Sequence, residues 1–295
     1  MNIIESIFMG IVQGVTEFLP VSSSGHLAIY QSLTGLEPNL LNMTLMHMGT
    51  LLAVILCFRK SIGRLLVEFV SMVKDIFGGR FKWREMNGER RTIVMLVISS
   101  AMLIPFVLPL IPAGGEMQSI KDIVAPATNG SMMWLVGLCL IITAGLLFVA
   151  DYLTRKKPGK RTVATTKDAV TIGLAQGLAA ALPGVSRSGS TTSTGLILGL
   201  NKKYAAEYSF ILSIPAVLAA NVLELGEAIS SDVPAADTSI IGIILGIITA
   251  FVTGVLAIRI FMWLIKKNKY WVFAIYCAAV GAMVFFSDII LRATR

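Results

Sequence analysis

Charged residues are scarce in this sequence. Asp, Glu, Lys and Arg make up 14% of the 295 residues, whereas apolar residues make up 55%, and the mean hydropathy is +0.78. A soluble domain carries roughly 25% charged residues. Too few charges remain here to coat a water-facing surface, so the composition indicates an integral membrane protein.

Cysteine is also rare. The three cysteines, Cys57, Cys139 and Cys277, fall inside apolar runs and have no Cys-x-x-Cys neighbour. This spacing argues against a disulfide framework and against a zinc site. The first residues lack a cationic segment, and Gln13 and Glu17 interrupt the apolar stretch that follows, so we expect no cleavable signal peptide.

Long apolar runs are abundant, and six of them can cross a hydrocarbon core of about 30 Å. They cover approximately residues 43–58, 92–112, 131–150, 208–224, 239–265 and 271–291. We therefore expect an all-α polytopic membrane protein.

The loop charges predict the orientation of these spans. The formal net charge is +8, and the cations gather in 59–91, 151–168 and 259–270, which we expect on the cytoplasmic side. The connections 113–130 and 225–238 are poor in cations and are expected outside. Because the cations follow the loops between spans, they indicate membrane orientation rather than a nucleic-acid partner.

Two further segments, 1–42 and 168–207, are apolar but are interrupted by Pro, Gly, Ser and charged residues. A full crossing by either would break the alternation of loop charges, so we expect each to enter the bilayer and return on its own side. Irregular backbone at that depth is tolerated only where protein buries it or water lines it. Each of these re-entrant hairpins is therefore a candidate site.

The two hairpins also resemble each other in sequence. Gly-Ile-Val-Gln-Gly at 10–14 recurs as Gly-Leu-Ala-Gln-Gly at 173–177, and Pro20 recurs as Pro183 at the same offset of 163 residues. One residue is then inserted, and each segment continues into a serine-rich break. This register predicts an internal repeat.

We therefore predict two repeats in one membrane domain, residues 1–150 with the hairpin 1–42 and residues 151–295 with the hairpin 168–207. Each repeat holds one re-entrant helical hairpin and three transmembrane helices. Because three crossings are an odd number, the second repeat is inverted relative to the first. The hairpin tips are expected to meet near the midplane, where inverted-repeat folds bind ligands.

Polar residues gather in the first tip. Gln13 and Glu17 are four residues apart and share one helix face. Pro20 ends that helix, and a serine of the run 22–24 can cap the next one and leave its N–H groups directed at an anion. An ionisable group in the membrane is costly, so each one needs a function.

The second tip, Pro-Gly-Val-Ser-Arg-Ser-Gly-Ser-Thr at 183–191, contains the one basic residue between Lys167 and Lys202, namely Arg187. The planar guanidinium suits phosphate or carboxylate. A structural ion pair with Glu17, accompanied by Ser/Thr packing contacts, is the alternative. We favour an anion site, because a carboxylate, an imidazole, hydroxyls and a guanidinium gather in two paired breaks.

At these two segments the sequence resembles the bacterial undecaprenyl-diphosphate phosphatases, the bacitracin-resistance BacA/UppP family. That family's [E/Q]-x3-E motif stands here as Gln13-x3-Glu17, and its P-G-x-S-R-S-x-x-T motif stands at 183–191. The stretch Glu-Phe-Leu-Pro-Val-Ser-Ser-Ser-Gly-His at 17–26 and the length are also similar. The resemblance implies a membrane enzyme that converts undecaprenyl diphosphate to the monophosphate carrier of cell-wall synthesis, and it implies bacitracin resistance.

The resemblance further implies a multi-pass protein of the bacterial inner membrane with a site open to the extracytoplasmic side. The expected partners are a polyprenyl diphosphate and membrane lipid; the oligomeric state stays open, with a homodimer as one option. A divalent cation, Mg²⁺ or Ca²⁺, would be held by Glu17 and Gln13. Many members have glutamate where this chain has Gln13, so the ion would have one anionic ligand fewer here.

The resemblance assigns Ser23 as the nucleophile. His26 lies three residues later and can take the serine proton if a helix begins there. Glu17 would orient His26 or hold the cation, and Arg187 would clamp the diphosphate and offset transition-state charge. The expected substrate-binding residues are Ser22, Ser24, Ser186, Ser188 and Thr191.

Three alternatives remain at this point. The nucleophile can instead be His26, through a phosphohistidine. The same architecture also serves secondary transporters and lipid flippases, and a scaffolding membrane protein is the third reading. The other histidine, His47, lies at the mouth of an apolar span and is interpreted as structural.

Overall fold

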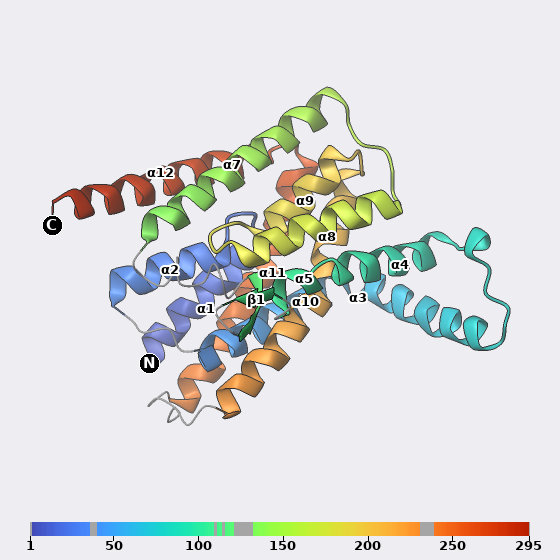
Figure 1. Cartoon of the computed structure of the whole chain (residues 1–295), viewed down its shortest axis with the longest axis horizontal. Coiled ribbons are helices and arrows are strands. Elements are labelled where there is room, and N and C mark those ends of the chain that lie inside the picture. The colour runs from blue at the N-terminus through green and yellow to red at the C-terminus, as the bar shows by residue number, and fades with distance from the viewer. Residues whose placement is uncertain are drawn as a thin grey trace.

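The computed structural model describes residues 2–35, 40–108, 111–113, 116–120, 132–230 and 239–294. These residues are almost entirely helical (Figure 1). The exception is a small antiparallel pair of strands, β1 (Ile111–Ala113) and β2 (Glu116–Gln118). The all-α prediction is thus confirmed apart from this short pair.

The helices lie close to where the apolar runs predict them. In chain order they are α1 (Ile3–Phe18), α2 (Ser23–Thr34), α3 (Leu40–Phe77), the 3₁₀ turn η1 (Trp83–Glu85), α4 (Gly88–Ala101), α5 (Ile104–Val107), α7 (Met133–Lys156), α8 (Thr166–Ala181), α9 (Arg187–Ile197), α10 (Lys202–Ser230), α11 (Ile240–Lys266) and α12 (Trp271–Ala293).

Five helical stretches among the described residues are long and apolar enough to cross a membrane. They are Gly88–Val107, Met133–Lys156, Lys202–Leu223, Ile240–Lys266 and Trp271–Ala293. The sixth expected span, 43–58, lies within the first half of α3 and is not among these five.

The expectation of a loop over 59–91 is wrong for its first part. Helix α3 continues to Phe77 with a kink at Phe58 (φ −108°, ψ 17°), because no proline interrupts the chain before the glycine pair at 78–79. Gly79 has φ 66°, a left-handed conformation that commonly ends helices. The outer half of α3 therefore forms a helical hairpin with α4, which projects at the right of Figure 1.

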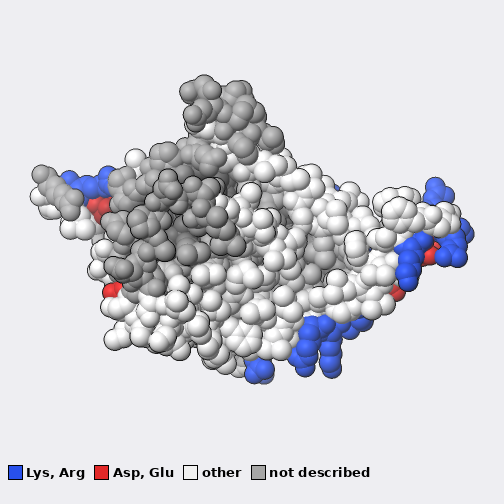
Figure 2. All heavy atoms as spheres, turned by 90° about the horizontal axis from the view of Figure 1, so that it is seen from below, with Lys and Arg blue, Asp and Glu red and all other residues white. Residues whose placement is uncertain are grey.

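Charged residues hold this projecting hairpin together. Arg90 of α4 donates to Glu68 over 3.0 Å and to Asp75 over 2.7 Å, both on α3. Figure 2 shows Lys and Arg at the end of the molecule that this hairpin forms, along the lower edge and at the opposite end, whereas the described surface between the two ends is mostly white.

Helix α11 carries an exposed apolar face. Its exposed large side chains recur every three or four residues, as one helix face requires: Ile241, Ile244, Ile248, Val252, Leu256, Ile260 and Trp263. A soluble protein rarely exposes so continuous an apolar stripe. Hydrocarbon, not water, is the solvent that this face suits.

The repeated glycines lie where the first helix of each hairpin meets a long helix. Helix α1 packs along α11, and α8 packs along α4. A Cβ atom on Gly10 would lie 2.4 Å from the Gly246 carbonyl oxygen of α11, and one on Gly173 would lie 2.5 Å from the Ser99 carbonyl oxygen of α4. Direct backbone contact thus explains why both copies of the motif need glycine at this position.

An aromatic cluster supports the end of α1. The Phe210 ring of α10 meets the edge of Phe18 at a centroid distance of 5.7 Å and contacts Phe58 and Phe261 at 5.6 and 5.1 Å. Phe18, Phe210 and Phe261 are all buried. This packing fixes the residue next to Glu17 and therefore positions the first tip.

Candidate active site

The first tip is a strained turn between α1 and α2. After the extended Leu19, the Val21 N–H donates to the Leu19 carbonyl over 2.7 Å around Pro20, and Ser22 adopts φ 71° and ψ 99°. Such a conformation costs a non-glycine residue of order 1–3 kcal/mol and tends to occur at functional sites. It lets the Ser22 hydroxyl accept a hydrogen bond from the Gly25 N–H over 3.2 Å and cap α2.

The second tip repeats this capping with different residues. The Ser186 hydroxyl accepts from the Gly189 N–H over 3.1 Å and caps α9. Gly184 supplies the left-handed turn with φ 97°, and the Ser186 N–H donates to the Thr143 hydroxyl of α7 over 3.1 Å. Both tips therefore end in a helix N-terminus, whose unpaired N–H groups and dipole favour anions.

The two tips are in direct contact. The Gly184 N–H donates to the Ser24 hydroxyl over 3.4 Å, and the Ser188 hydroxyl donates to the Leu19 carbonyl over 3.2 Å. Residues about 160 positions apart in the chain thus share one site.

Glu17 is the centre of the polar contacts between the tips. One carboxylate oxygen pairs with the Arg187 guanidinium. The other accepts from the Ser23 hydroxyl over 2.7 Å and from the Gln13 amide over 3.0 Å, and the His47 Nε2 lies 3.9 Å from it. Since Glu17 is 7% exposed, these partners replace the water that would otherwise solvate its charge.

A cavity of about 260 Å³ opens beside this cluster. One set of its lining residues is polar: Thr16, Glu17, Ser22, Ser23, Ser24, His47, Gln176, Ser186, Arg187 and Asn221. The other set is apolar: Leu103, Val107, Ala179, Ala180, Val185, Ala216, Val217, Ala219, Ala220 and Leu223. The cavity therefore suits a ligand with an anionic head and an apolar tail.

Most of the residues predicted from the tips line this cavity, but four do not: Gln13, His26, Ser188 and Thr191. The Gln13 amide donates to the Glu17 carboxylate. Ser188 bonds to the other tip, and the Thr191 hydroxyl lies 2.9 Å from the Arg187 carbonyl and 2.5 Å from the Ser209 hydroxyl. Ser188 and Thr191 thus fix the second tip in place.

His26 is not brought to Ser23. Its Nδ1 lies 2.8 Å from the Ser22 carbonyl oxygen and its Nε2 lies 2.8 Å from the Tyr276 hydroxyl. Because a carbonyl only accepts, Nδ1 carries the proton, so the neutral ring accepts at Nε2 from Tyr276. The group within hydrogen-bonding distance of the Ser23 hydroxyl is Glu17.

Four polar residues of the cavity, Thr16 among them, were missed by the sequence reasoning. His47 was interpreted as structural, yet it lines the cavity beside Glu17. Gln176 corresponds to Gln13 in the repeat, and that correspondence was the available signal. Asn221 lies in an expected span and has no motif to mark it.

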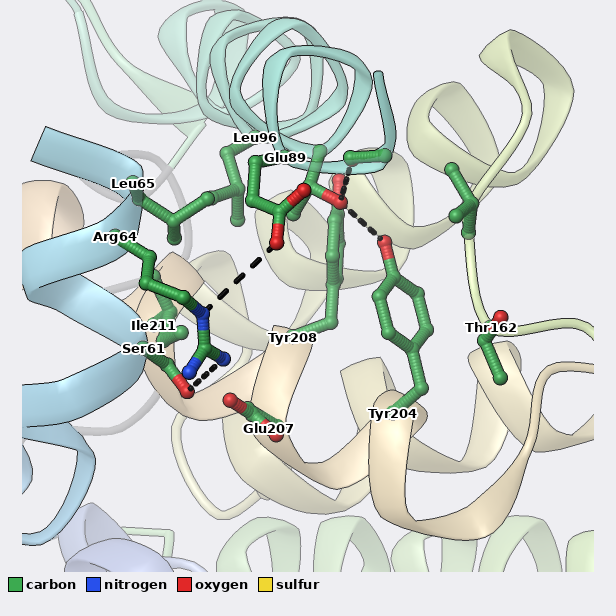
Figure 3. Close-up of a pocket in the computed structure, with 13 residues that line it drawn as sticks. Ser61, Arg64, Leu65, Glu89, Leu96, Thr162, Tyr204, Glu207, Tyr208 and Ile211 are labelled. Carbon is green, nitrogen blue, oxygen red and sulfur yellow. Dashed lines mark hydrogen bonds and ion pairs between the residues drawn. The ribbon is translucent and has the colours of Figure 1, made fainter. Parts of the chain in front are cut away.

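A second cavity, of about 280 Å³, lies between α3, α4 and α10 (Figure 3). Its Arg64 and Glu89 face each other at 3.9 Å, and the Thr92 hydroxyl lies 3.1 Å from the Tyr204 hydroxyl. None of the residues predicted from the tips lines it. We therefore locate the candidate site at the tips.

Comparison with known proteins identifies the family of this chain. The profile of the family described as "Bacitracin resistance protein BacA" matches residues 6–283. The chain belongs to the BacA family. The family predicted from the two motifs is thereby confirmed.

Relatives of this BacA chain carry the name undecaprenyl-diphosphatase. The protein from Methanosphaera stadtmanae is 36% identical over 297 residues, which cover 99% of this chain and 100% of the relative. The protein from Bacteroides fragilis is 40% identical over 286 residues, covering 95% and 96%. The one from Alkaliphilus metalliredigens is 38% identical over 288 residues, covering 96% and 98%.

The described residues contain no group of three His, Cys, Asp or Glu side chains that by themselves hold a metal. A cation bound mainly by substrate phosphates needs fewer protein ligands. Glu17 offers the carboxylate, and the buried Gln13 Oε1 has no hydrogen-bond partner. These two oxygen atoms are the metal ligands that the sequence predicted, and Glu17 is the one that lines the cavity.

Proposed function

We propose that this BacA-family protein hydrolyses undecaprenyl diphosphate to undecaprenyl phosphate and inorganic phosphate. The observation that carries the proposal is the contact between Ser23, Glu17 and Arg187 in an amphipathic cavity. A hydroxyl that donates a hydrogen bond to a carboxylate can act as a nucleophile with that carboxylate as its base, and the guanidinium beside it can bind the phosphate. The names of the relatives support this choice of lipid.

In the first step, the Ser23 oxygen attacks the terminal phosphorus and its proton passes to Glu17. The bond from that phosphorus to the bridging oxygen breaks, and the lipid monophosphate leaves. Arg187 has five N–H donors, so it can bind phosphoryl oxygens while it stays paired with Glu17. The helix N-termini at Ser22 and Ser186 offset the growing negative charge.

In the second step, a water attacks the phosphoserine. The bond between phosphorus and the Ser23 oxygen breaks, Glu17 returns its proton to that oxygen, and inorganic phosphate leaves. His47 lies next to Glu17 and lines the cavity, which suits it to accept a proton from the water.

His26 acts in this proposal as a positioning residue. Its N–H to the Ser22 carbonyl holds the strained turn that directs Ser23 at Glu17. Its Nε2 lone pair is engaged by Tyr276, which argues against a phosphohistidine.

A divalent cation, Mg²⁺ or Ca²⁺, would be held by Glu17 and Gln13 together with phosphate oxygens. Bound there, it would neutralise part of the diphosphate charge.

The apolar lining of the cavity would hold the first part of the prenyl chain. The small residues Ala216, Ala219 and Ala220 of α10 leave room for it. We further propose that the two halves are inverted repeats with re-entrant hairpins in the cell membrane. The reciprocal packing of α1 on α11 and of α8 on α4 supports this, because a two-fold exchange of the halves relates the two contacts.

From the loop charges we propose that the site opens to the extracytoplasmic side. There the product would be recycled as the carrier for cell-wall synthesis, and removal of the diphosphate would confer bacitracin resistance.

The test is phosphate release from undecaprenyl diphosphate by the purified protein in detergent, where no gradient exists to drive a transporter. We expect release by the wild type, a loss of at least about 10³-fold in Ser23→Ala, and retained lipid binding. Ser287→Ala is the matched control, because its exposed hydroxyl bonds only within α12. Wild-type turnover in Ser23→Ala would exclude this nucleophile, and no release by the wild type would exclude the activity.

A further inference from the structure

Gln176 is a buried amide without partners. The residue is 1% exposed, and neither its Nε2 nor its Oε1 has a hydrogen-bond partner. Burying an amide in this way costs free energy, so native structures pair nearly all such groups. An unpaired amide that borders a cavity indicates a ligand that completes its hydrogen bonds.

Gln176 differs from other buried polar groups without hydrogen-bond partners among the described residues. Thr192 is 0% exposed and has an unpaired hydroxyl, but it lines no described cavity. Asn221 lines the cavity of about 260 Å³ beside Glu17, called the tip cavity below. Its Nδ2 lies 3.0 Å from the Met48 sulfur, so only its Oδ1 is unpaired. In Gln176 both amide atoms are unpaired and the side chain lines the tip cavity.

The position of Gln176 indicates which part of the ligand its amide contacts. It shares its wall of the cavity with Ala179 and Ala180 of α8, whereas Ser23, Glu17 and Arg187 come from the tips. In a lipid diphosphate, the phosphate joined to the prenyl chain lies between the terminal phosphate and the apolar tail. An amide set among apolar lining residues is therefore placed for the lipid-linked phosphate.

We propose that Gln176 is a substrate-binding residue whose Nε2 donates a hydrogen bond to the lipid-linked phosphate, with its Oε1 accepting from a water. The proposal rests on the proposed function and deepens it. It also gives different roles to Gln13 and Gln176, which occupy matching positions of the repeat. The Gln13 amide donates to Glu17, whereas Gln176 has no such partner and faces the ligand.

The test replaces the amide by an apolar group of similar size in Gln176→Leu, with Thr192→Val as the matched control. Each change removes an unpaired buried polar group, so each should leave thermal stability equal or higher. Only Gln176→Leu should raise KM for undecaprenyl diphosphate, by about 10-fold or more, because a hydrogen bond to a charged group is lost. Its kcat should change little, since the contact is the same in substrate and transition state.

Product inhibition identifies the phosphate that is bound. Undecaprenyl phosphate keeps the lipid-linked phosphate, so its inhibition constant should rise by the same factor as KM. The inhibition constant of inorganic phosphate, which occupies the terminal position, should stay unchanged. Gln176→Glu keeps the size but adds a negative charge, and it should weaken binding of undecaprenyl phosphate further.

Unchanged KM and unchanged inhibition by undecaprenyl phosphate in both Gln176 variants would overturn the proposal. So would weaker inhibition by inorganic phosphate alone, because it would place the amide at the terminal phosphate. The proposed function fails separately, if the wild type releases no phosphate. Binding of undecaprenyl phosphate, measured by thermal shift in wild type and Gln176→Glu, then still decides whether the amide contacts a phosphate.

Discussion

The buried pair of Glu17 and Arg187 should show a clear difference between stability and activity. Their side chains are 6% and 20% exposed, so each neutralises the other where little water reaches. Removal of one partner leaves an uncompensated charge, which in buried pairs costs about 3–5 kcal/mol. Some water reaches Arg187, so we expect about 3 kcal/mol for either Glu17→Gln or Arg187→Gln.

The double variant Glu17→Gln with Arg187→Gln contains no unpaired charge, and its two amides can bond to each other. Its loss of stability should therefore be smaller than the sum of the single losses by about 2 kcal/mol or more. Activity should behave differently, because the base and the clamp are both gone. We expect each single variant to lose about 10³-fold in kcat/KM and the double variant to recover none of it.

The assay combines denaturant titration, followed by circular dichroism in detergent, with phosphate release on the same preparations. Additive stability losses would refute the buried pair. Recovery of activity together with stability in the double variant would refute the chemical roles, because the two residues would then matter only for folding.

Three further predictions concern the Arg187 guanidinium, the close packing of Gly173 and the divalent cation. Arg187→Lys should lose at least about 100-fold in kcat/KM, since a point charge does not replace a planar fork; near-normal phosphate release would refute the clamp. Gly173→Ala should destabilise by about 1–3 kcal/mol in a denaturant titration, because its Cβ would lie 2.5 Å from the Ser99 carbonyl oxygen. Gly145→Ala meets no atom within 4 Å and should not destabilise; equal losses in both would contradict the packing role. EDTA should lower phosphate release, and Mg²⁺ or Ca²⁺ should restore it; EDTA-resistant release would exclude the cation.

The sequence predicted the helices well wherever an apolar run ended at a proline, a glycine or a cluster of charges. It failed over 59–77, where cations favour a loop by composition. No proline interrupts the helix before Gly79. Charged side chains are tolerated on the projecting hairpin because Arg90 of α4 pairs with Glu68 and Asp75 of α3. Charge in a sequence therefore does not by itself indicate where a helix ends.

At the candidate site, most of the residues predicted from the sequence line one cavity, but the sequence did not predict all of their hydrogen-bond partners. The spacing from Ser23 to His26 suggested a pair on one helix face. In the structure α2 begins at Ser23, and the positive φ of Ser22 directs the Ser23 hydroxyl to Glu17, on the preceding helix. His26 meets Tyr276 of α12, a contact over 250 positions that no local spacing encodes.

The repeat explains how two similar hairpins make one asymmetric site. The capping serines, Ser22 and Ser186, occupy matching positions and build the same helix start in both tips. At the next matching position the first tip has Ser23 and the second has Arg187, so in the proposed mechanism one supplies the nucleophile and the other the cation for the phosphate. Neither tip contains both groups. The proposed chemistry therefore requires the contact between the tips, and the packing of α1 on α11 and of α8 on α4 supports the candidate site as much as the polar residues do.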